Sequence, residues 1–358
     1  MPPLLRFLIH RLISIPITLF IITVILYGFV MLTPVEARAT LYFPKGLNPD
    51  RMTNEELQRF TEVTIKKWHL DEPFPVQYSL WVSNLVRGKW GWSPVLGEDV
   101  LPALLRRTPV SAELMLYSFL VFIPLGLISG IRAGANKDRP VDLRFRLAAF
   151  IGISFPTFIM ALILMRIFYV GLYWFPPERL GFQSSRLVAS EAFRTFTGLL
   201  TIDGLLNGRP EISLEALRHL VLPVVTLSIA YWGILGRVTR AAVIDETSKE
   251  YIIAAEARGI SQHDLVWKHM GRNALTPALT SSILSAAALF TSMFVVEIIF
   301  GFRGVSSLIA VTFDYVPDVA ILLGFAIYSV VVVLLMMLAL DLLIAILDPR
   351  VREEVISR

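Results

Sequence analysis

The chain has 358 residues, of which 55% are hydrophobic and only 17% are charged, whereas soluble domains carry about a quarter charged residues. This deficit excludes an ordinary soluble globular protein, and the net charge of +4, which is not gathered in one basic stripe, argues against nucleic-acid binding. The absence of cysteine excludes disulfides and thiolate metal sites. The composition therefore predicts an integral membrane protein that is surrounded by lipids.

Six apolar segments are long enough to cross a bilayer, which takes about 20 residues for a hydrocarbon core of about 30 Å. The sequence therefore predicts an all-α membrane protein with six transmembrane helices. We expect the first to be a retained span, because no small-residue cleavage site follows it. Four of the six segments are interrupted by a proline, which neighbouring helices can accommodate. These prolines are Pro16, Pro124, Pro156 and Pro223. The six segments are Leu12–Thr33, Val110–Ile131, Leu147–Trp174, His219–Gly236, Ala278–Phe300 and Val319–Leu347.

The outer segment after the first span, 34–109, is too long to be a simple connection. It contains a predicted helix, Asn54–Leu70, for which Thr53 or Asn54 is the N-cap. An aromatic-rich stretch follows, from Tyr78 to Trp92. The segment is either a scoop that meets an extracytoplasmic partner or a small cap that packs on its own aromatic side chains. Residues 175–218 form a second outer insertion.

The inner segment 237–277 is polar and exceeds what a turn between two spans requires. Residues Lys249–Arg258 predict a short helix, and Gly259 supplies the left-handed residue that ends it. Ser261 is the predicted N-cap of a second helix, with an acidic residue three positions later, and we expect this helix to end near Met270. This helix–glycine–helix arrangement either transmits a partner's movement to the flanking spans or only covers the bundle.

Lysine and arginine in the connecting segments predict the orientation, because they concentrate on the cytoplasmic side of a membrane. With the N-terminus inside, the inner segments hold 16 basic and 10 acidic residues, whereas the longer outer segments hold 16 of each. We therefore expect both termini in the cytoplasm. The inner segments are 1–11, 132–146, 237–277 and 348–358, and the outer segments are 34–109, 175–218 and 301–318.

Residues 250–259, Glu-Tyr-Ile-Ile-Ala-Ala-Glu-Ala-Arg-Gly, resemble the "EAA" loop of the permease subunits of ATP-binding-cassette importers. The match is to the peptide-type variant, which has Tyr before the helix, a basic residue before the glycine and a later Arg-Asn-Ala-Leu-x-Pro run, here residues 272–277. The sequence departs from the general pattern at Ile253, where that pattern has an acidic residue, and in a longer spacing from Gly259 to the proline. Both departures fit the peptide subgroup better than the sugar subgroup.

Further motifs similar to those of the peptide subgroup follow in the same order along the chain. Because they extend over nearly its whole length, the chain resembles the dipeptide/oligopeptide (peptide/nickel) importer permeases. It resembles most the first of the two permease subunits, which has the large loop after span one. The motifs are Arg11-Leu12, Leu32-Thr33-Pro34, Leu70–Gln77, Gly88–Ser93, Trp174–Pro177 and Asp341–Arg350.

The resemblance implies a type I importer fold in three parts. Residues 1–107 form an N-terminal span with its external loop, 108–347 a five-helix core that includes the coupling loop 237–277, and 348–358 a cytoplasmic tail. The chain would then form half of a translocation path for di- or oligopeptides across the cytoplasmic (inner) membrane. A nickel chelate, glutathione or an oligosaccharide is the alternative solute.

The implied partners are a second permease subunit, two ATPase subunits and an extracytoplasmic substrate-binding protein. The chain has no G-x-x-x-x-G-K-[ST] phosphate loop, so we expect ATP and Mg to bind to the ATPases and the chain to be a transport subunit without enzymatic activity or cofactor. A membrane enzyme is less favoured because H-E-x-x-H, G-x-S-G and G-x-G-D motifs are absent. An ion-coupled carrier is less favoured because the sequence shows neither an inverted repeat nor broken helices at matching positions.

The coupling loop supplies the residues that the resemblance implies will contact the ATPase. In the family this loop forms a helix that seats in a groove of the ATPase subunit. The corresponding residues here are Tyr251, Ala254, Ala255, Ala257, Arg258, Gly259 and Ser261.

Four ionisable residues fall in or beside the predicted spans, where a charge at the bilayer centre costs about 2.5–3.5 kcal/mol. Glu113 and Glu297 lie near outer ends and Asp341 near an inner end, where hydration is the simplest explanation. Arg166 lies mid-span, about 12 Å along the helix from Trp174. Arg166 and Glu297 are both predicted to line the translocation path, and Arg166 is predicted to attract a substrate carboxylate there. The alternative is an ion pair with Glu297 or with the partner permease.

Overall fold

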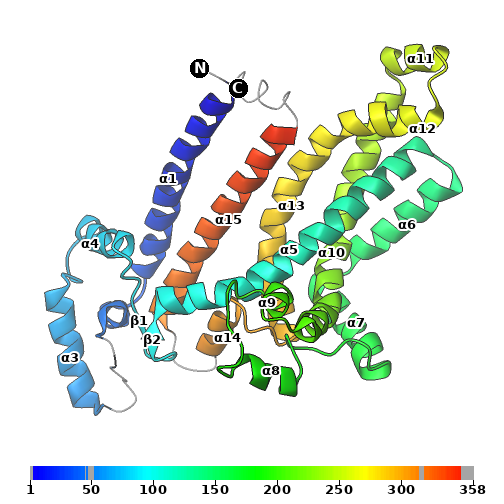
Figure 1. Ribbon diagram of the computed structural model, residues 1–358. Helices are drawn as coiled ribbons and strands as arrows, with labels where there is room; N and C mark the ends of the chain where they lie inside the picture. The colour runs from blue at the N-terminus through cyan, green and yellow to red at the C-terminus, as the bar shows by residue number, and fades with distance from the viewer. Residues whose placement is uncertain (1–2, 45, 47–51, 314–317, 348–358) are drawn as a thin grey trace. The chain divides into compact units, whose positions relative to one another are not determined.

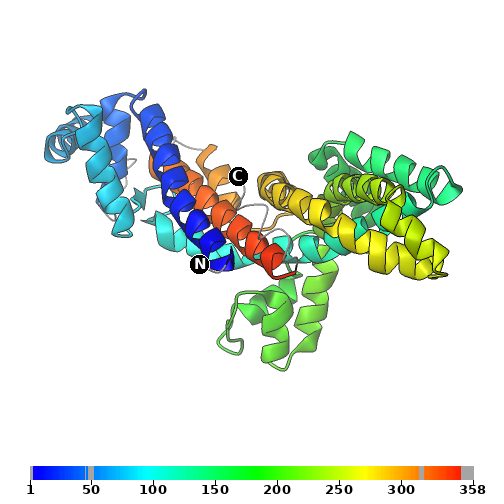
Figure 2. The ribbon, with the colours of Figure 1, turned by 90° about the horizontal axis from the view of Figure 1, so that it is seen from above.

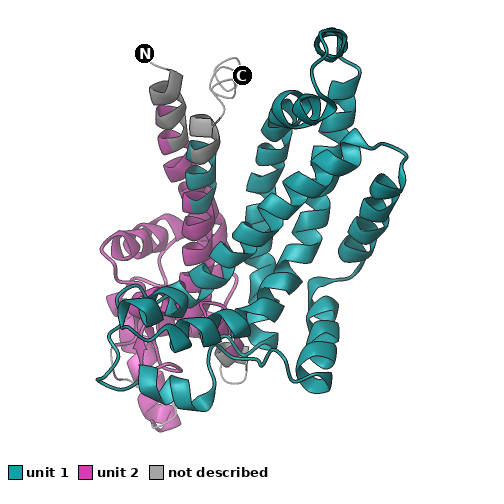
Figure 3. Cartoon of the chain, turned by 45° about the vertical axis from the view of Figure 1, so that its right-hand side comes forward, with its two compact units in different colours: residues 1–7, 109–303, 336–358 teal, residues 8–108, 304–335 magenta. Residues whose placement is uncertain are grey.

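The computed structural model describes residues 3–44, 46, 52–313 and 318–347, and these are mostly helical (Figure 1). The chain divides into two compact units (Figure 3). Unit 1 comprises residues 1–7, 109–303 and 336–358, and unit 2 comprises residues 8–108 and 304–335. The predicted tail 348–358 lies outside the described residues.

Five of the described helices are long and apolar enough to cross a membrane, and a bent pair of helices makes a sixth candidate. The expectation of an all-α membrane protein with about six spans is therefore confirmed. Most observed helices extend beyond the predicted bounds, because hydropathy marks where apolar surface ends and not where backbone hydrogen bonding ends. The five are α1 (Pro3–Val30), α5 (Val100–Ala135), α10 (Pro210–Thr247), the continuous helix Gln262–Ile299, and α15 (Val319–Leu347).

The third predicted span, Leu147–Trp174, is not one straight helix. It is divided between α6 (Pro140–Ser154) and α7 (Thr157–Leu164), whose axis continues in the π-helix η3 (Met165–Gly171), and the two parts meet at 101°. Pro156 causes the break, because it has no N–H and its ring disfavours the helical conformation of the preceding residue. That residue, Phe155, is extended, with φ −91° and ψ 129°.

In unit 2 the outer segment 34–109 folds into short elements that gather at one side of α1 (Figures 1 and 2). The aromatic stretch packs on α1, where Tyr27 stacks on Trp81 with ring centroids 4.9 Å apart. These rings belong to a buried cluster with side chains of α5, α14 (Ser307–Phe313) and α15. The elements of the segment are α2 (Val35–Ala39), η1 (Thr40–Tyr42), α3 (Asn54–Lys67), α4 (Phe74–Val86) and the antiparallel strands β1 (Trp92–Ser93) and β2 (Glu98–Asp99).

The predicted N-cap of α3 is confirmed as Thr53. Its hydroxyl accepts a hydrogen bond from the Glu56 N–H, and the Thr53 N–H donates to the Glu56 carboxylate at 2.9 Å. That backbone donor lowers the pKa of the Glu56 carboxyl below its ordinary value. The helix ends at Lys67, three residues before the predicted Leu70, because His69 adopts a left-handed conformation with φ 54°.

In unit 1 the central helix is α10, which packs against α6, α7, α9 (Leu200–Leu206) and α13 (Gly271–Ile299). It also meets α5 along glycines spaced four residues apart: Gly126, Gly130 and Gly134. A Cβ atom on Gly130 would lie 2.6 Å from the carbonyl oxygen of Gly236 in α10. The two backbones are therefore in direct contact, as small-xxx-small sequences allow in membrane helices.

The two ends of α10 carry different structures (Figure 1). The second outer insertion, with α8 (Phe182–Val188) and α9, lies where α10 begins. The short helix α11 (Glu250–Ala257) lies beyond the other end, where α10 leads into the segment 237–277. The two features that sequence analysis singled out in this unit are thus separated by the length of the bundle.

Candidate functional site

The segment 237–277 is mostly helical. Helix α10 continues without a break past Gly236 to Thr247. On the return side α12 (Gln262–Asp264) runs through the π-helix η4 (Leu265–Met270) directly into α13, so the expected end near Met270 is wrong. Gly271 does not stop this helix, because it keeps helical angles of φ −60° and ψ −41°. α11 is therefore carried between two helices that are each continuous with a membrane span.

The predicted helix and glycine elbow are both present. α11 covers Glu250–Ala257 within the predicted range, and Gly259 has φ +78°, the left-handed conformation that glycine adopts most readily. Its N–H donates to the Glu256 carbonyl at 2.9 Å. Ser261 caps the following helix by accepting a hydrogen bond from the Asp264 N–H at 3.2 Å. These bonds define the geometry of the turn after α11.

One side of α11 is buried and another is exposed. Ile252 and Ala255 pack on the bundle, with apolar side chains contributed by α5, α10, η4 and α13. Ile253 is 59% exposed, and Ala254 and Ala257 are exposed beside it at helical spacing. α11 therefore offers a small, apolar and accessible surface. The buried neighbours are Ile131, Val243, Leu265, Met270 and Ala274.

Six of the seven predicted contact residues are exposed: Tyr251, Ala254, Ala257, Arg258, Gly259 and Ser261. Ala255 is only 8% exposed and belongs to the apolar cluster beneath α11. Its small side chain therefore sets how closely α11 approaches the bundle and does not lie on the accessible surface.

Sequence reasoning missed a buried carboxylate at the base of α11. Glu246, near the end of α10, accepts hydrogen bonds from Lys249 Nζ, the Tyr251 hydroxyl and, at 3.1 Å, Asn273 Nδ2. Asn273 Nδ2 also donates to the Tyr251 oxygen at 2.7 Å. We call Glu246, Tyr251 and Asn273 the carboxylate clasp. No local sequence pattern indicates this group, because its members are separated by up to 27 residues.

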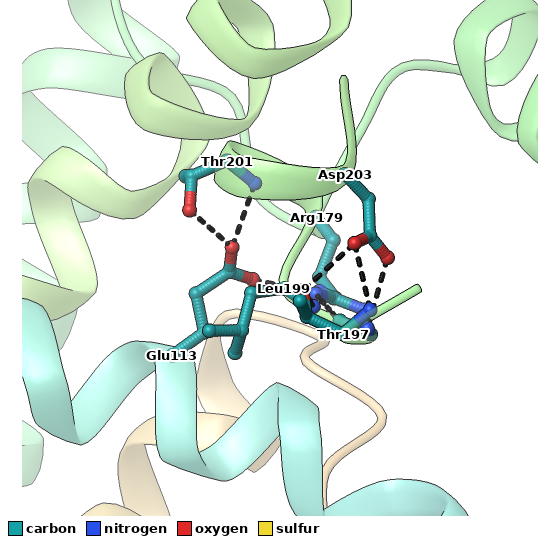
Figure 4. A network of polar contacts seen from close by, with 7 residues as sticks. Glu113, Arg179, Thr197, Leu199, Thr201 and Asp203 are labelled. Carbon is teal, nitrogen blue, oxygen red and sulfur yellow. Dashed lines mark hydrogen bonds and ion pairs between the residues drawn. The ribbon is translucent and has the colours of Figure 1, made fainter. Parts of the chain in front are cut away.

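At the other end of unit 1, Glu113 of α5 anchors the second outer insertion (Figure 4). Its carboxylate is 1% exposed, forms an ion pair with Arg179, and accepts hydrogen bonds from Thr201 N and Oγ1, both at 2.8 Å. Arg179 also donates to the Gly198 carbonyl at 3.1 Å. The expected hydration of Glu113 is therefore replaced by protein donors.

A second buried carboxylate, Asp203 of α9, organises the loop beside Glu113 (Figure 4). It accepts hydrogen bonds from the N–H and hydroxyl groups of Thr197, at 2.8 and 2.7 Å, and from the Gly198 N–H at 2.8 Å. Gly198 has φ +77° and leaves no room for a side chain, since a Cβ would lie 2.6 Å from Pro109. The insertion is thus a folded part of unit 1.

We expect Glu113→Ala to loosen this insertion, because it removes the carboxylate that pairs with Arg179 and accepts both bonds from Thr201, at a cost of about 2–3 kcal/mol. Hydrogen exchange of residues 197–203 in the purified full chain should become at least tenfold faster. Glu191→Ala is the matched control, because Glu191 is an exposed acid of the same insertion. Equal exchange in the two variants would contradict the anchoring role.

The structure does not bring Arg166 and Glu297 together. Arg166 lies in η3 and is exposed, whereas Glu297 of α13 is 0% exposed and accepts a hydrogen bond from the Ser111 hydroxyl. Among the described residues Arg166 forms no ion pair. Asp341 is also buried, so within the chain neither Glu297 nor Asp341 has the exposure that the expected hydration requires.

The similarity to known proteins extends over nearly the whole chain. A family model described as "Binding-protein-dependent transport system inner membrane component" matches residues 123–353. The dipeptide transport system permease protein DppB of Bacillus subtilis is 26% identical, over 97% of this chain and 98% of that protein. The di/tripeptide transport system permease protein DppB of Pseudomonas aeruginosa is 28% identical, over 98% and 100%. The probable D,D-dipeptide transport system permease protein DdpB of Escherichia coli is 32% identical, over 79% and 81%.

Proposed function

Because this chain belongs to the family of binding-protein-dependent transport system inner membrane components, we propose that it is a permease subunit of an ATP-binding-cassette importer. We propose further that it forms half of a translocation path for di- or oligopeptides. The observation that carries the proposal is α11, a short helix with an exposed apolar face that is held between two membrane spans. The names of the full-length relatives support the peptide substrate.

The proposed assembly contains a second permease subunit, two ATPase subunits that bind ATP and Mg, and an extracytoplasmic substrate-binding protein. The chain itself is a transport subunit in the cytoplasmic (inner) membrane, with both termini and α11 in the cytoplasm. The excess of basic residues in the inner segments supports this orientation. The insertions 34–109 and 175–218 then face the binding protein.

The proposed mechanism couples movement of the ATPases to the path through rigid helices. ATP binding closes the ATPase pair and displaces α11 together with the turn at Gly259. The displacement passes into α10 and α13, because both continue from the coupling segment into the membrane without a loop. α10 has 38 residues and is about 57 Å long, which exceeds the thickness of the hydrocarbon core. A tilt at one end is therefore transmitted to the other.

Reconstitution of the whole importer tests this function. The complex is placed in proteoliposomes, and uptake of labelled di- and tripeptides is measured with and without ATP and the binding protein. We expect uptake to require both. Uptake of only a nickel chelate, glutathione or an oligosaccharide would overturn the peptide substrate and leave the permease role intact. Failure of the ATPase subunits to co-purify with the chain would overturn the permease role itself.

We also propose that Arg166 lines the translocation path and attracts the carboxylate of a peptide substrate. Its exposure on η3 supports this role, whereas the burial of Glu297 supports an internal role for that residue. In the assembled complex, Arg166→Met should raise the KM for peptides with a free carboxyl terminus about tenfold, because a bond between two charged groups is lost. Amidated peptides should be less affected.

Arg166→Lys, which keeps the charge, is the matched control and should retain most of the uptake. Normal transport by Arg166→Met with an unchanged substrate range would contradict the path role. Loss of the second permease subunit during purification would instead indicate that Arg166 forms an ion pair with that subunit.

A further inference from the structure

The carboxylate clasp joins the three helices α10, α11 and α13 at one buried group. Glu246 comes from the last turn of α10, Tyr251 from the first turn of α11 and Asn273 from the first turn of α13. Glu246 is 7% exposed, although the residues before and after it are exposed. A buried carboxylate is stable only when it is well supplied with donors. Glu246 receives donors from Lys249, Tyr251 and Asn273.

The clasp is a closed ring of hydrogen bonds. Asn273 Nδ2 reaches both Glu246 Oε2, at 3.1 Å, and the Tyr251 oxygen, at 2.7 Å, and the Tyr251 hydroxyl donates to the same carboxylate. Bonds to a charged acceptor are stronger and more directional than those between neutral groups. Small relative movements of the three helices therefore strain at least two bonds at once.

Other contacts of α11 with the bundle resist movement less specifically. Ile252 and Ala255 hold its inner side by apolar packing, which has no directional preference and tolerates sliding. Its second end is followed by the glycine turn at Gly259, and there Gln262 Nε2 donates to the Glu256 carboxylate at 2.7 Å, but both of these side chains are exposed. The clasp supplies buried polar contacts at the N-terminal end of α11, close to the ends of α10 and α13 from which α11 is carried.

We infer that Glu246 is a positioning residue for coupling: it fixes α11 to α10 and α13 together, so that a displacement of α11 moves both spans as one body. This inference rests on the proposed function, in which an ATPase subunit displaces α11. Glu246 does not touch the partner in this arrangement. It acts through Tyr251, whose ring is partly exposed beside the accessible face of α11.

The test compares Glu246→Ala, Glu246→Gln and Asp245→Ala in the complete importer. Asp245 is the matched control, because it is the neighbouring acid on the same helix, is exposed, and lies outside the clasp. Co-purification measures assembly, and the number of substrate molecules taken up per ATP hydrolysed measures coupling. A residue that only supports folding would lower both uptake and ATP hydrolysis and leave their ratio unchanged.

We expect Glu246→Ala to lower the ratio of uptake to ATP hydrolysis about tenfold, because the strong bonds to a charged acceptor are lost. Glu246→Gln keeps one acceptor oxygen but loses the charge, so its ratio should lie between those of Glu246→Ala and the wild type. Asp245→Ala should match the wild type. An unchanged ratio in Glu246→Ala would overturn the inference.

Tyr251→Phe covers the case in which Glu246→Ala does not assemble, because it removes only the hydroxyl that donates to Glu246 and accepts from Asn273. We expect it to lower the same ratio, and a normal ratio would overturn the inference.

Hydrogen exchange of residues 250–258 in the purified full chain separates this inference from the proposed function. Faster exchange in Glu246→Ala than in Asp245→Ala supports the clasp even if no ATPase binds, whereas equal exchange contradicts it.

Discussion

Gly130→Leu is expected to prevent unit 1 from reaching its native packing, with a loss of stability of about 3 kcal/mol or more. Even the first side-chain atom would lie 2.6 Å from the Gly236 carbonyl oxygen and 2.6 Å from Thr239 Cβ. The obstructing oxygen belongs to the α10 backbone, so a change of rotamer cannot relieve the overlap. The helices would have to separate, and α10 would lose its direct contact with α5.

The yield of monodisperse full-length protein in detergent, together with its thermal unfolding midpoint, measures this effect. Gly28→Leu is the matched control, since it places the same side chain on a glycine of an apolar helix with nothing within 4 Å of the added Cβ. We expect a near-normal yield for the control and little or none for Gly130→Leu. Equal behaviour of the two variants would show that α5 and α10 are not in close contact.

Ile253→Asp is expected to weaken association with the ATPase subunits about 30-fold or more, since central apolar anchors of an interface can contribute 2 kcal/mol or more. Ile253 is the one large apolar side chain on the accessible face formed with Ala254 and Ala257. A carboxylate there would have to be desolvated against whatever surface receives the helix. The fold should be unaffected, because the side chain does not support the bundle.

Binding of purified ATPase subunits to the permease pair in detergent measures this effect. Val63→Asp is the matched control, because Val63 is a similarly exposed apolar residue on α3 and lies in the other unit. Enlarging Ala255 would be a poor test by comparison, since that residue is buried and its replacement would disturb packing as well. ATPase binding that is equal in Ile253→Asp and the wild type would exclude the apolar face as the docking surface.

The helical elements near the coupling segment could be predicted because local rules determine them. The α11 helix, the left-handed Gly259 and the Ser261 cap each depend on residues within a few positions of one another. The length of the flanking helices could not be predicted, because polar residues after Gly236 lower the hydropathy but do not end the helix. The break at Pro156 was missed for a related reason: whether neighbours accommodate a proline depends on the tertiary structure.

Two of the sequence motifs contain side chains whose role is visible only in the structure, because these side chains form long-range hydrogen bonds. In the Leu70–Gln77 motif, Gln77 Nε2 donates to the Leu70 carbonyl at 2.8 Å while its oxygen accepts from Arg38 at 3.0 Å. In the Gly88–Ser93 motif, the Ser93 hydroxyl donates to Asp318 at 2.7 Å. Asp318 lies 225 residues further along the chain, so pattern analysis of either segment alone cannot reveal the pair.

The break between α6 and α7 also constrains how the protein is made. α6 has 15 residues and rises about 22 Å, and the α7–η3 arm has the same number of residues, so neither arm alone covers a hydrocarbon core of about 30 Å. Both arms pack on α10: in α6, Gly152 lies against Ile229 and Ile153 against Gly233, and α7 contacts the same helix. During synthesis α10, which begins at Pro210, is made only after both arms. In a chain that is stalled before α10 is made, the bent pair lacks this packing partner and should be more accessible to water-soluble labels than in the complete protein.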